Sequence, residues 1–227
     1  MKLILLRHGE SQWNLENRFT GWTDVDLTEN GKNEAKKAGK LINKENLEIN
    51  TVYVSYLKRA IKTSKICLKY LNSSKCEVVY DWRLNERHYG NLQGLNKLET
   101  AKKYGDKQVL TWRRSYDIPP PPLSLDDKRH PKYDLLYKDL KEAHLPRSES
   151  LKDTLERVKP LWINQVMPNL KAGKNILVVA HGNSLRAIVK MLKNISNKNI
   201  VKLNIPTGSP YVFEFNEKFQ LIYDEYL

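Results

Sequence analysis

The sequence predicts an α/β fold with a mainly parallel central sheet flanked by helices. Short apolar runs typical of buried strands alternate along the chain with longer segments of helical periodicity. The clearest runs are residues 3–6 and 175–180, which carry no charged side chain and therefore suit the interior of a parallel sheet. The chain has 227 residues, of which 40% are hydrophobic, so it is long enough to bury a core of its own.

The first third of the chain alternates strand and helix. Thr28 can begin the first long helix, because its side-chain oxygen can accept a hydrogen bond from an N–H group of the first turn. Ala35, Ala38, Leu41 and Ile42 then form one apolar face of that helix. In order, the expected elements are a strand at 3–6, a helix at 29–43, a strand at 52–54, a helix at 57–71 and a strand at 76–80.

The last third repeats the alternation and ends in a hairpin. Ser150 followed by Asp153 resembles a capping box and predicts a helix start, and Pro160 should bend or interrupt that helix. The remaining expected elements are a strand at 175–180, a helix at 184–192, and an edge hairpin with strands near 211–215 and 220–223.

A basic, proline-rich insertion at about residues 95–147 separates these two parts. Residues 95–116 are expected to be helical, whereas the four prolines at 119–122 stop any helix and impose an extended segment. Residues 123–147 show no clear periodicity. Neither an internal repeat nor a long linker is present, so we expect residues 1–227 to form a single domain.

The charge distribution points to an anionic partner. The chain carries 39 Lys and Arg against 26 Asp and Glu, a net charge of +13, and residues 51–118 alone hold 14 basic and 6 acidic groups. Such a surplus suits an anion site or a nucleic-acid face, although scattered lysines are more typical of a solvated surface. The adjacent Arg113 and Arg114 are better functional candidates. A nucleic-acid-binding protein has only the net charge in its favour, because no recognition motif or interleaved aromatic platform accompanies it.

Targeting features also shape the expectation. The apolar stretch at the N-terminus is too short for a signal peptide or a membrane span. Cys67 and Cys76 are too few for a disulfide framework. We therefore expect a cytoplasmic protein that binds neither membrane nor nucleic acid.

Two histidine–glycine steps follow the two best strands. His8-Gly9 comes after the first strand, and His181-Gly182 comes after the strand at 175–180. Ligands of open α/β sheets bind beyond the carboxyl ends of strands, so both histidines should point into one crevice. The glycines should let the backbone turn tightly and approach a ligand. A single histidine could be a hydrogen-bonded structural residue, but the pair beside Arg7 indicates a reactive site.

Chemistry on phosphorus suits this pair best. The other histidines are scattered, which disfavours a metal site, and no G-x-S-x-G elbow is present for a serine nucleophile. An imidazole can instead attack phosphorus, with Arg7 and Arg59 as cationic donors around the phosphoryl oxygens. Glu86 could act as proton donor, although glutamates are more often surface ion-pair partners.

Several longer motifs carry a family resemblance. The sequence resembles the histidine phosphatase superfamily and, within it, the cofactor-dependent phosphoglycerate mutases, over nearly the whole chain. The matching motifs are Arg7-His8-Gly9-Glu10-Ser11-Gln12-Trp13-Asn14, Phe19-Thr20-Gly21-Trp22, Leu57-Lys58-Arg59-Ala60, Leu84-Asn85-Glu86-Arg87-His88-Tyr89-Gly90, Gln93-Gly94-Leu95-Asn96-Lys97, Trp112-Arg113-Arg114, Ala180-His181-Gly182-Asn183-Ser184-Leu185-Arg186 and Asn204-Ile205-Pro206-Thr207-Gly208.

The resemblance implies an isomerase, an intramolecular phosphotransferase of glycolysis and gluconeogenesis. It implies a three-layer sandwich of the phosphoglycerate mutase type and interconversion of 3- and 2-phosphoglycerate by a homodimer. The cofactor 2,3-bisphosphoglycerate would prime phosphorylation of His8, and no metal would be needed. Glu86 would be the acid/base, and His181 would stabilise the transferring phosphoryl group. The implied substrate-binding residues are Arg7, Ser11, Asn14, Thr20, Gly21, Arg59, Arg87, Tyr89, Lys97, Arg113, Arg114, Gly182 and Asn183.

Two points stay open within the enzyme class. A bisphosphoglycerate phosphatase or a synthase-like mutase would use the same His8 chemistry. Only the cations that would bind the far end of the substrate, Lys97, Arg113 and Arg114, distinguish these activities in the sequence. Relatives also commonly continue beyond the residue that matches Leu227 with a flexible Gly- and Lys-bearing tail. From this difference we expect that water reaches phosphorylated His8 more easily and that phosphatase activity is higher, unless the insertion closes the site instead.

Overall fold

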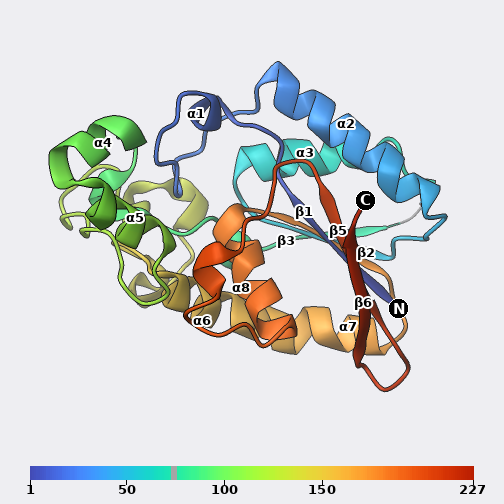
Figure 1. The fold of residues 1–227 in the computed structure, drawn as a ribbon. Coiled ribbons are helices and arrows are strands. Elements are labelled where there is room, and N and C mark those ends of the chain that lie inside the picture. Colours follow the sequence, from blue (N-terminus) through green and yellow to red (C-terminus); the bar gives the residue numbers. More distant parts are fainter. Residues whose placement is uncertain (73–75) are drawn as a thin grey trace.

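One mixed sheet forms the centre of the computed structural model, which describes residues 1–72 and 76–227 (Figure 1). The strands lie in the order β3-β2-β4-β1-β5-β6, and the first four are parallel to one another. Strand β5 is antiparallel to β1, and β6 is antiparallel to β5. The predicted mainly parallel sheet with an edge hairpin is therefore confirmed. The strands are β1 (Lys2–Arg7), β2 (Thr51–Val54), β3 (Glu77–Tyr80), β4 (Ile176–Ala180), β5 (Pro210–Phe215) and β6 (Leu221–Tyr226).

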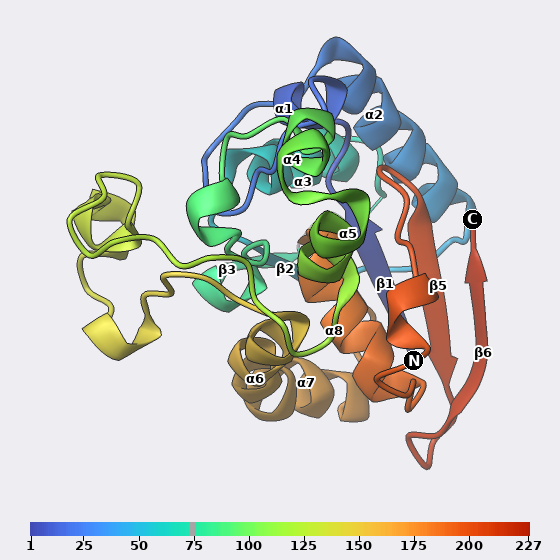
Figure 2. The same ribbon diagram turned by 60° about the vertical axis from the view of Figure 1, so that its left-hand side comes forward.

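Helices cover both faces of this sheet, which completes the predicted three layers. Helices α2 and α3 lie against one face, and α6, α7 and α8 lie against the other (Figures 1 and 2). Helices α4 and α5 lie beyond one end of the strands (Figure 2). The helices are α1 (Gln12–Leu15), α2 (Glu29–Lys44), α3 (Lys58–Leu68), α4 (Lys97–Tyr104), α5 (Asp106–Arg114), α6 (Leu151–Leu161), α7 (Met167–Lys171) and α8 (Gly182–Leu192).

The alternation of side chains along β1 builds two cores. Leu3 and Leu5 pack on the side of α6 to α8, whereas Ile4 and Leu6 pack on the side of α2 and α3. All four side chains are buried, because successive residues of a strand point to opposite faces of a sheet that is covered on both sides. A charged side chain at any of these four positions would be buried without a partner, so the centre of β1 requires apolar residues.

Helix starts follow the predicted capping chemistry. The Thr28 hydroxyl accepts a 3.0 Å hydrogen bond from the Gly31 N–H at the start of α2. Ser150 and Asp153 form the predicted capping box: Asp153 N–H donates to Ser150 Oγ, and Ser150 N–H donates to the Asp153 carboxylate. Ends are less well predicted, since α3 stops at Leu68 instead of residue 71.

Two helical segments differ from a plain helix for identifiable reasons. The segment at 95–116 divides into α4 and α5 at Gly105, whose φ of 84° lies in the left-handed region that glycine tolerates. Pro160 lies inside α6, and the α-helical pattern ends one residue later, continuing as a π-helical turn over Trp162–Val166. Proline has no N–H to donate to the preceding turn, so a changed hydrogen-bond pattern at this point is the interruption that the sequence predicts.

The connections after β1 and β4 leave the sheet in opposite directions. The chain after β1 leads to α2 on one face, whereas the chain after β4 leads directly into α8 on the other face. The two strands are adjacent, with Arg7 opposite Ala180. Diverging connections of this kind open a crevice beyond the strand ends, where α/β proteins bind ligands. In the described part of the chain, no helix is long and apolar enough to cross a membrane.

Candidate active site

His8 and His181 lie side by side at the bottom of this crevice. Their rings are 4.9 Å apart, centroid to centroid, and both side chains are buried. The His8 N–H donates to the Ala180 carbonyl at 3.0 Å, which extends the pairing of β1 with β4 by one residue. The parallel register of two neighbouring strands thus brings together residues that are 173 positions apart in sequence, as the two histidine–glycine steps predict.

Hydrogen bonding fixes the tautomer of His8. Its Nδ1 lies 2.7 Å from the Gly9 carbonyl oxygen, and because a carbonyl can only accept, Nδ1 carries the proton. Nε2 therefore keeps a free lone pair. Burial, and then the positive charges of Arg59 and Arg7, lower the pKa of His8 well below its usual value. His8 is thus a neutral imidazole with an available nucleophilic nitrogen.

His181 is also held neutral. Burial lowers its pKa well below the usual value, and Arg59, His8 and Arg7 add to this shift. Its Nε2 lies 2.6 Å from the hydroxyl oxygen of Ser55, which follows β2. Its buried Nδ1 has no hydrogen-bond partner among the described residues. A ring with one satisfied nitrogen and one unsatisfied nitrogen can offer a hydrogen bond to a ligand beside His8.

Arg7 and Arg59 are anchored to backbone carbonyls. Arg7 donates to the Ile205 carbonyl at 2.7 Å, and Arg59 donates to the carbonyls of Thr23 and Gly21 at 2.9 and 2.8 Å. Burial lowers the pKa of both guanidinium groups, that of Arg59 to about 10. The Nε atoms of both arginines are buried and have no partner in the residues described, so each retains a donor that an anion could satisfy.

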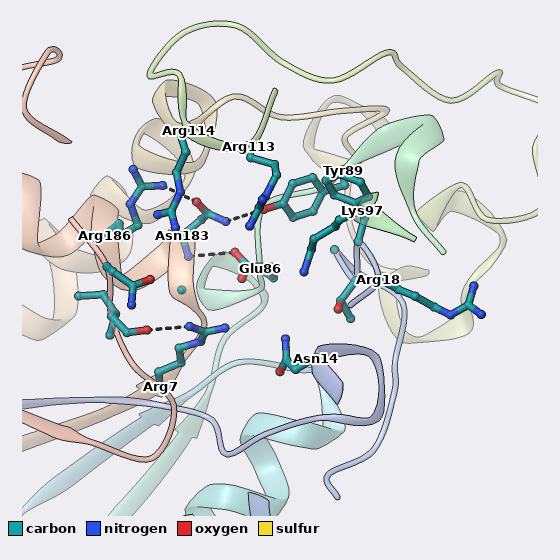
Figure 3. A pocket seen from close by; sticks show the side chains of 16 residues that line it. Arg7, Asn14, Arg18, Glu86, Tyr89, Lys97, Arg113, Arg114, Asn183 and Arg186 are labelled. Atoms are coloured by element: carbon teal, nitrogen blue, oxygen red, sulfur yellow. Dashed lines mark hydrogen bonds between the residues drawn. The ribbon is translucent and has the colours of Figure 1, made fainter. Parts of the chain in front are cut away.

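A cavity of about 170 Å³ lies beside the histidines, since Arg7 and Gly182, their neighbours in sequence, both line it (Figure 3). In the part of the chain that the structure describes, the lining holds six cationic side chains and one carboxylate, that of Glu86. This charge balance suits a small polyanion. The lining residues are Arg7, Asn14, Arg18, Phe19, Thr20, Gly21, Glu86, Tyr89, Lys97, Arg113, Arg114, Gly182, Asn183, Arg186, Asn204 and Ile205.

Glu86 is built into the wall of this cavity. Its Oε1 accepts hydrogen bonds from the backbone N–H groups of Arg87 and Asn183, at 2.8 and 3.0 Å. A side chain placed on Gly182 would meet Oε2 of Glu86 and Nε of Arg7 at 3.6 Å, so these groups surround the first turn of α8. Glu86 is buried, and no salt bridge to it is recorded among residues 1–72 and 76–227. The surface ion-pair alternative is therefore wrong.

The far side of the cavity concentrates positive charge. Burial lowers the pKa of Lys97, and so does the nearby charge of Arg113. Burial and the charge of Arg113 also lower the pKa of Arg114. Asn183 Nδ2 donates to the hydroxyl of Tyr89 at 3.3 Å, which joins the two polar groups on this side. Cations that lower one another's pKa values are stabilised by an anion placed between them.

Some predicted site residues lie behind the lining. Ser11 caps α1 and holds Asn14 by reciprocal hydrogen bonds, so it acts on the cavity through Asn14. Arg87 donates to the Arg113 carbonyl at 2.9 Å, and its guanidinium lies 4.6 Å from the ring centroid of Tyr89. His8, His181 and Arg59 are also buried outside the lining, whereas the remaining predicted residues line the cavity.

Five lining residues were absent from the predicted set: Arg18, Phe19, Arg186, Asn204 and Ile205. A signal for Arg186 exists in the sequence, because it follows Asn183 by three positions and therefore shares its face of α8. Arg18 belongs to a loop, where its guanidinium is held by the Glu16 carboxylate and the Gly94 carbonyl. Its position depends on long-range packing, so no local pattern could have identified it.

Gly9 has a different role from the one that the sequence suggested. A Cβ at this position would lie 2.1 Å from the carbonyl oxygen of Gly31, so the residue permits two backbones to touch and fixes the start of α2 near the site. Of the two glycines that follow a histidine, Gly182 is the one that lines the cavity. No group of three or more His, Cys, Asp or Glu side chains arranged to hold a metal ion occurs among the described residues.

Comparison with known proteins agrees with this geometry. Residues 3–127 and 123–223 match the histidine phosphatase superfamily (branch 1). A 2,3-bisphosphoglycerate-dependent phosphoglycerate mutase of Parabacteroides distasonis is 58% identical over 225 residues, which cover 99% of this chain and 91% of that protein. One from Porphyromonas gingivalis is 55% identical over 226 residues, with coverage of 100% and 91%.

A solved structure of a mycobacterial glucosyl-3-phosphoglycerate phosphatase in complex with VO3 has a TM-score of 0.74 at 23% identity, covering 99% of this chain and 96% of that one. Its similarity concerns the fold alone. The sequence identities with the mutases are far higher and extend over the whole chain. The chain therefore belongs to the histidine phosphatase superfamily and, within it, to the family of the 2,3-bisphosphoglycerate-dependent phosphoglycerate mutases.

Proposed function

We propose that this protein is a phosphoglycerate mutase of glycolysis and gluconeogenesis, which interconverts 3- and 2-phosphoglycerate through phosphorylated His8. The observation that carries the proposal is the neutral His8, with its free Nε2, next to Arg7, which lines a cavity together with five further cations and one carboxylate. The names of the relatives at 55–58% identity support the same reaction.

The donor set fits 2,3-bisphosphoglycerate. The buried Nε atoms of Arg7 and Arg59 have no partner within the described residues, and such donors call for an anion. Arg7, Asn14, Arg59 and Gly182 would hold the phosphate nearest His8. The far end would bind to Thr20, Gly21, Tyr89, Lys97, Arg113, Arg114 and Asn183. When bound, 2,3-bisphosphoglycerate would supply the phosphoryl group that primes His8.

The residues of the chain divide the transfer between them. Nε2 of His8 forms its bond to phosphorus while the bond from phosphorus to the donor oxygen breaks. Glu86 Oε2 supplies the proton that this oxygen needs, and takes it back from the hydroxyl that attacks in the reverse direction. Arg7, Arg59 and His181 offer donors to the transferring phosphoryl oxygens. The charge that develops on these oxygens is therefore met by groups already in place.

Intact-mass measurement tests the proposal directly. After addition of 2,3-bisphosphoglycerate, the wild type should gain one phosphate and the His8→Ala variant none, and only the wild type should interconvert the two phosphoglycerates. His144→Ala provides the matched control, because it removes an exposed histidine that does not line the cavity and leaves the nucleophile in place. Phosphate on His8→Ala, or mutase turnover by that variant, would contradict the proposal.

We also infer a homodimer. Strand β3 is an open edge of the sheet, and Val78 and Tyr80 on it are exposed large side chains. An exposed edge strand with apolar side chains can pair with a second copy of the same strand. Analytical ultracentrifugation should give twice the chain mass for the wild type and the monomer mass for Val78→Lys, and a monomeric wild type would contradict the dimer.

The remaining parts of the proposal concern setting and scope. Cys67 and Cys76 are free in the described structure, which suits a cytoplasmic protein. The partner is a small anionic substrate, and neither nucleic acid nor membrane belongs to the proposed function. One domain over residues 1–227 would contain the whole site, since its residues come from both ends of the chain and from the insertion at 95–147.

A further inference from the structure

Arg186 makes a contact that selects one orientation of an amide. It lies on α8, buried, and its Nη1 donates to Oδ1 of Asn183 at 2.8 Å. Its Nη2 donates to the Ile200 carbonyl at 2.7 Å, which holds the guanidinium from the other side (Figure 3 shows the contact with Asn183). The arginine therefore has a fixed position from which it acts on Asn183.

The two ends of an asparagine amide have nearly the same shape but opposite hydrogen-bonding character. A guanidinium can only donate, so the end of Asn183 that faces Arg186 must be the oxygen. The Nδ2 group is thereby turned to the other side, where it donates to the hydroxyl of Tyr89 at 3.3 Å. A water or a hydroxyl in place of Arg186 could donate or accept and would not impose this choice.

The polarity continues to Tyr89. Its hydroxyl oxygen accepts from Asn183, so its proton remains for an acceptor in the cavity that Tyr89 and Asn183 both line. Each group in the chain therefore donates to the next, Arg186 to Asn183 and Asn183 to Tyr89, and the last donor, the Tyr89 hydroxyl, faces the cavity. An amide turned the other way would direct an oxygen lone pair towards the ligand and repel an anion.

We infer that Arg186 is a positioning residue for anion binding: it orients the Asn183 amide so that Asn183 and Tyr89 both present hydrogen-bond donors to the distal end of the phosphoglycerate. The inference rests on the proposed function for the identity of the ligand. Arg186 acts through Asn183, so its contribution should depend on the presence of that side chain.

A double-mutant cycle separates this role from a direct contact or a purely structural one. The dissociation constant of 3-phosphoglycerate is measured by calorimetry for the wild type, Arg186→Met, Asn183→Ala and the double variant. We expect Arg186→Met to weaken binding about 10-fold, the scale of a lost hydrogen bond to a charged group. In the Asn183→Ala background the same change should weaken binding by about threefold or less, the part due to removing one charge from the cavity.

Lys190→Met is the matched control. Lys190 lies on the same helix and donates to the Ile195 carbonyl at 2.5 Å, so it tethers the following loop as Arg186 does without contacting Asn183. Its loss should leave the dissociation constant within about twofold. Should Arg186→Met fail to fold, Arg186→Lys keeps the charge but cannot bond both acceptors, and it should show a smaller weakening that again disappears without Asn183.

Equal weakening by Arg186→Met in both backgrounds would overturn the inference, as would unchanged binding in the single variant. Weakening by Lys190→Met equal to that of Arg186→Met would assign the effect to the loop and would also overturn it. A wild type that binds 3-phosphoglycerate without isomerising it would contradict the proposed function, while the cycle would still report on Arg186.

Discussion

At Glu86, two backbone N–H groups hold one carboxylate oxygen, and the other oxygen lies close to Arg7 and Gly182. This division assigns the two oxygens different tasks, one fixed in position and one available for a proton. The sequence could suggest the residue, since it lies in a recognisable motif, but it could not exclude a surface ion pair. One N–H donor belongs to Arg87, the next residue in the loop, and the other belongs to Asn183 on α8, almost a hundred residues later. Only the fold brings α8 to this loop and buries the carboxylate.

Glu86→Gln should preserve binding and remove turnover. The glutamine Oε1 can still accept from Arg87 and Asn183, which turns Nε2, a group that cannot take up a proton, towards the cavity. Because general acid–base catalysis contributes roughly 10²–10⁴-fold, kcat should fall by about that factor. The dissociation constant of 3-phosphoglycerate should change by less than about threefold. Steady-state kinetics and calorimetry check both, and a loss of kcat under threefold would remove Glu86 from the mechanism.

At the scale of elements, the strands and caps were predictable, and so was the helical start of the insertion, but not the break within it. Residues 3–6 and 176–180 are apolar throughout, and both lie in buried strands, as expected for a parallel sheet covered on both faces. The break at Gly105 could not be located in advance, since a glycine inside a helical pattern is often tolerated. Residues 123–147 contain only short 3₁₀ turns, which have no periodic signature.

Helix α6 supports the loop that carries Glu86. Arg157 donates to the carbonyls of Arg83, Asn85 and Glu86 at 2.7, 3.2 and 3.3 Å, and it forms a buried ion pair with Glu149 at 2.7 Å. Glu149 in turn accepts from the backbone N–H of His88 at 2.8 Å. The helix and the loop are thus joined by one charged pair.

Arg157→Met should destabilise the protein strongly, because it leaves the Glu149 carboxylate buried without its partner. Removing one member of such a pair lowers the free energy of unfolding by about 3–5 kcal/mol. Lys58→Met is the control, since Lys58 and Asp24 form a more exposed pair that should contribute about 1 kcal/mol or less. Urea denaturation measures the free energy of unfolding of both variants. Similar decreases would show that the buried pair stabilises the protein no more than the exposed pair does.

The C-terminal end of α5 delivers Arg113 and Arg114 to the cavity together. Their joint replacement by alanine should reduce mutase turnover about 10²-fold or more, the scale of two lost hydrogen bonds to charged groups. Hydrolysis of phosphorylated His8 should fall much less, because water needs no grip at the distal end. Decay of the phosphoenzyme by intact mass and a coupled mutase assay give the two rates. Equal losses would place the pair at the phosphoryl site or in the fold itself.

At the scale of the whole molecule, the distribution of charged residues along the sequence predicted only part of the site. The basic segment at 51–118 contributes Lys97, Arg113 and Arg114, as its surplus suggests, but Arg7, Arg18 and Arg186 reach the cavity from elsewhere in the chain. The net charge can be counted from the sequence, but the fold decides which charged side chains meet at the cavity. The fold also buries the histidines, which lowers their pKa values.

Stability should therefore fall steeply in mild acid. Burial, the largest cause in each case, lowers the pKa of His8 and His181 well below the usual value and that of His88 to about 3. In the unfolded chain these three groups titrate near 6.5, so below that pH the unfolded state binds more protons and the free energy of unfolding decreases as pH falls.

Between pH 7.5 and 5.5 each group should remove about 1.4 kcal/mol, or about 4 kcal/mol for the three together, while their native forms stay neutral. Urea denaturation at pH 7.5, 6.5 and 5.5 measures this loss. His88→Gln is the informative variant, because a glutamine oxygen can replace Nδ1 as the acceptor of the Gly90 N–H without titrating. Its stability should depend on pH less than that of the wild type, by about 1.4 kcal/mol over the same interval. A wild type equally stable at pH 7.5 and 5.5 would show that the buried histidines take up protons in the folded state.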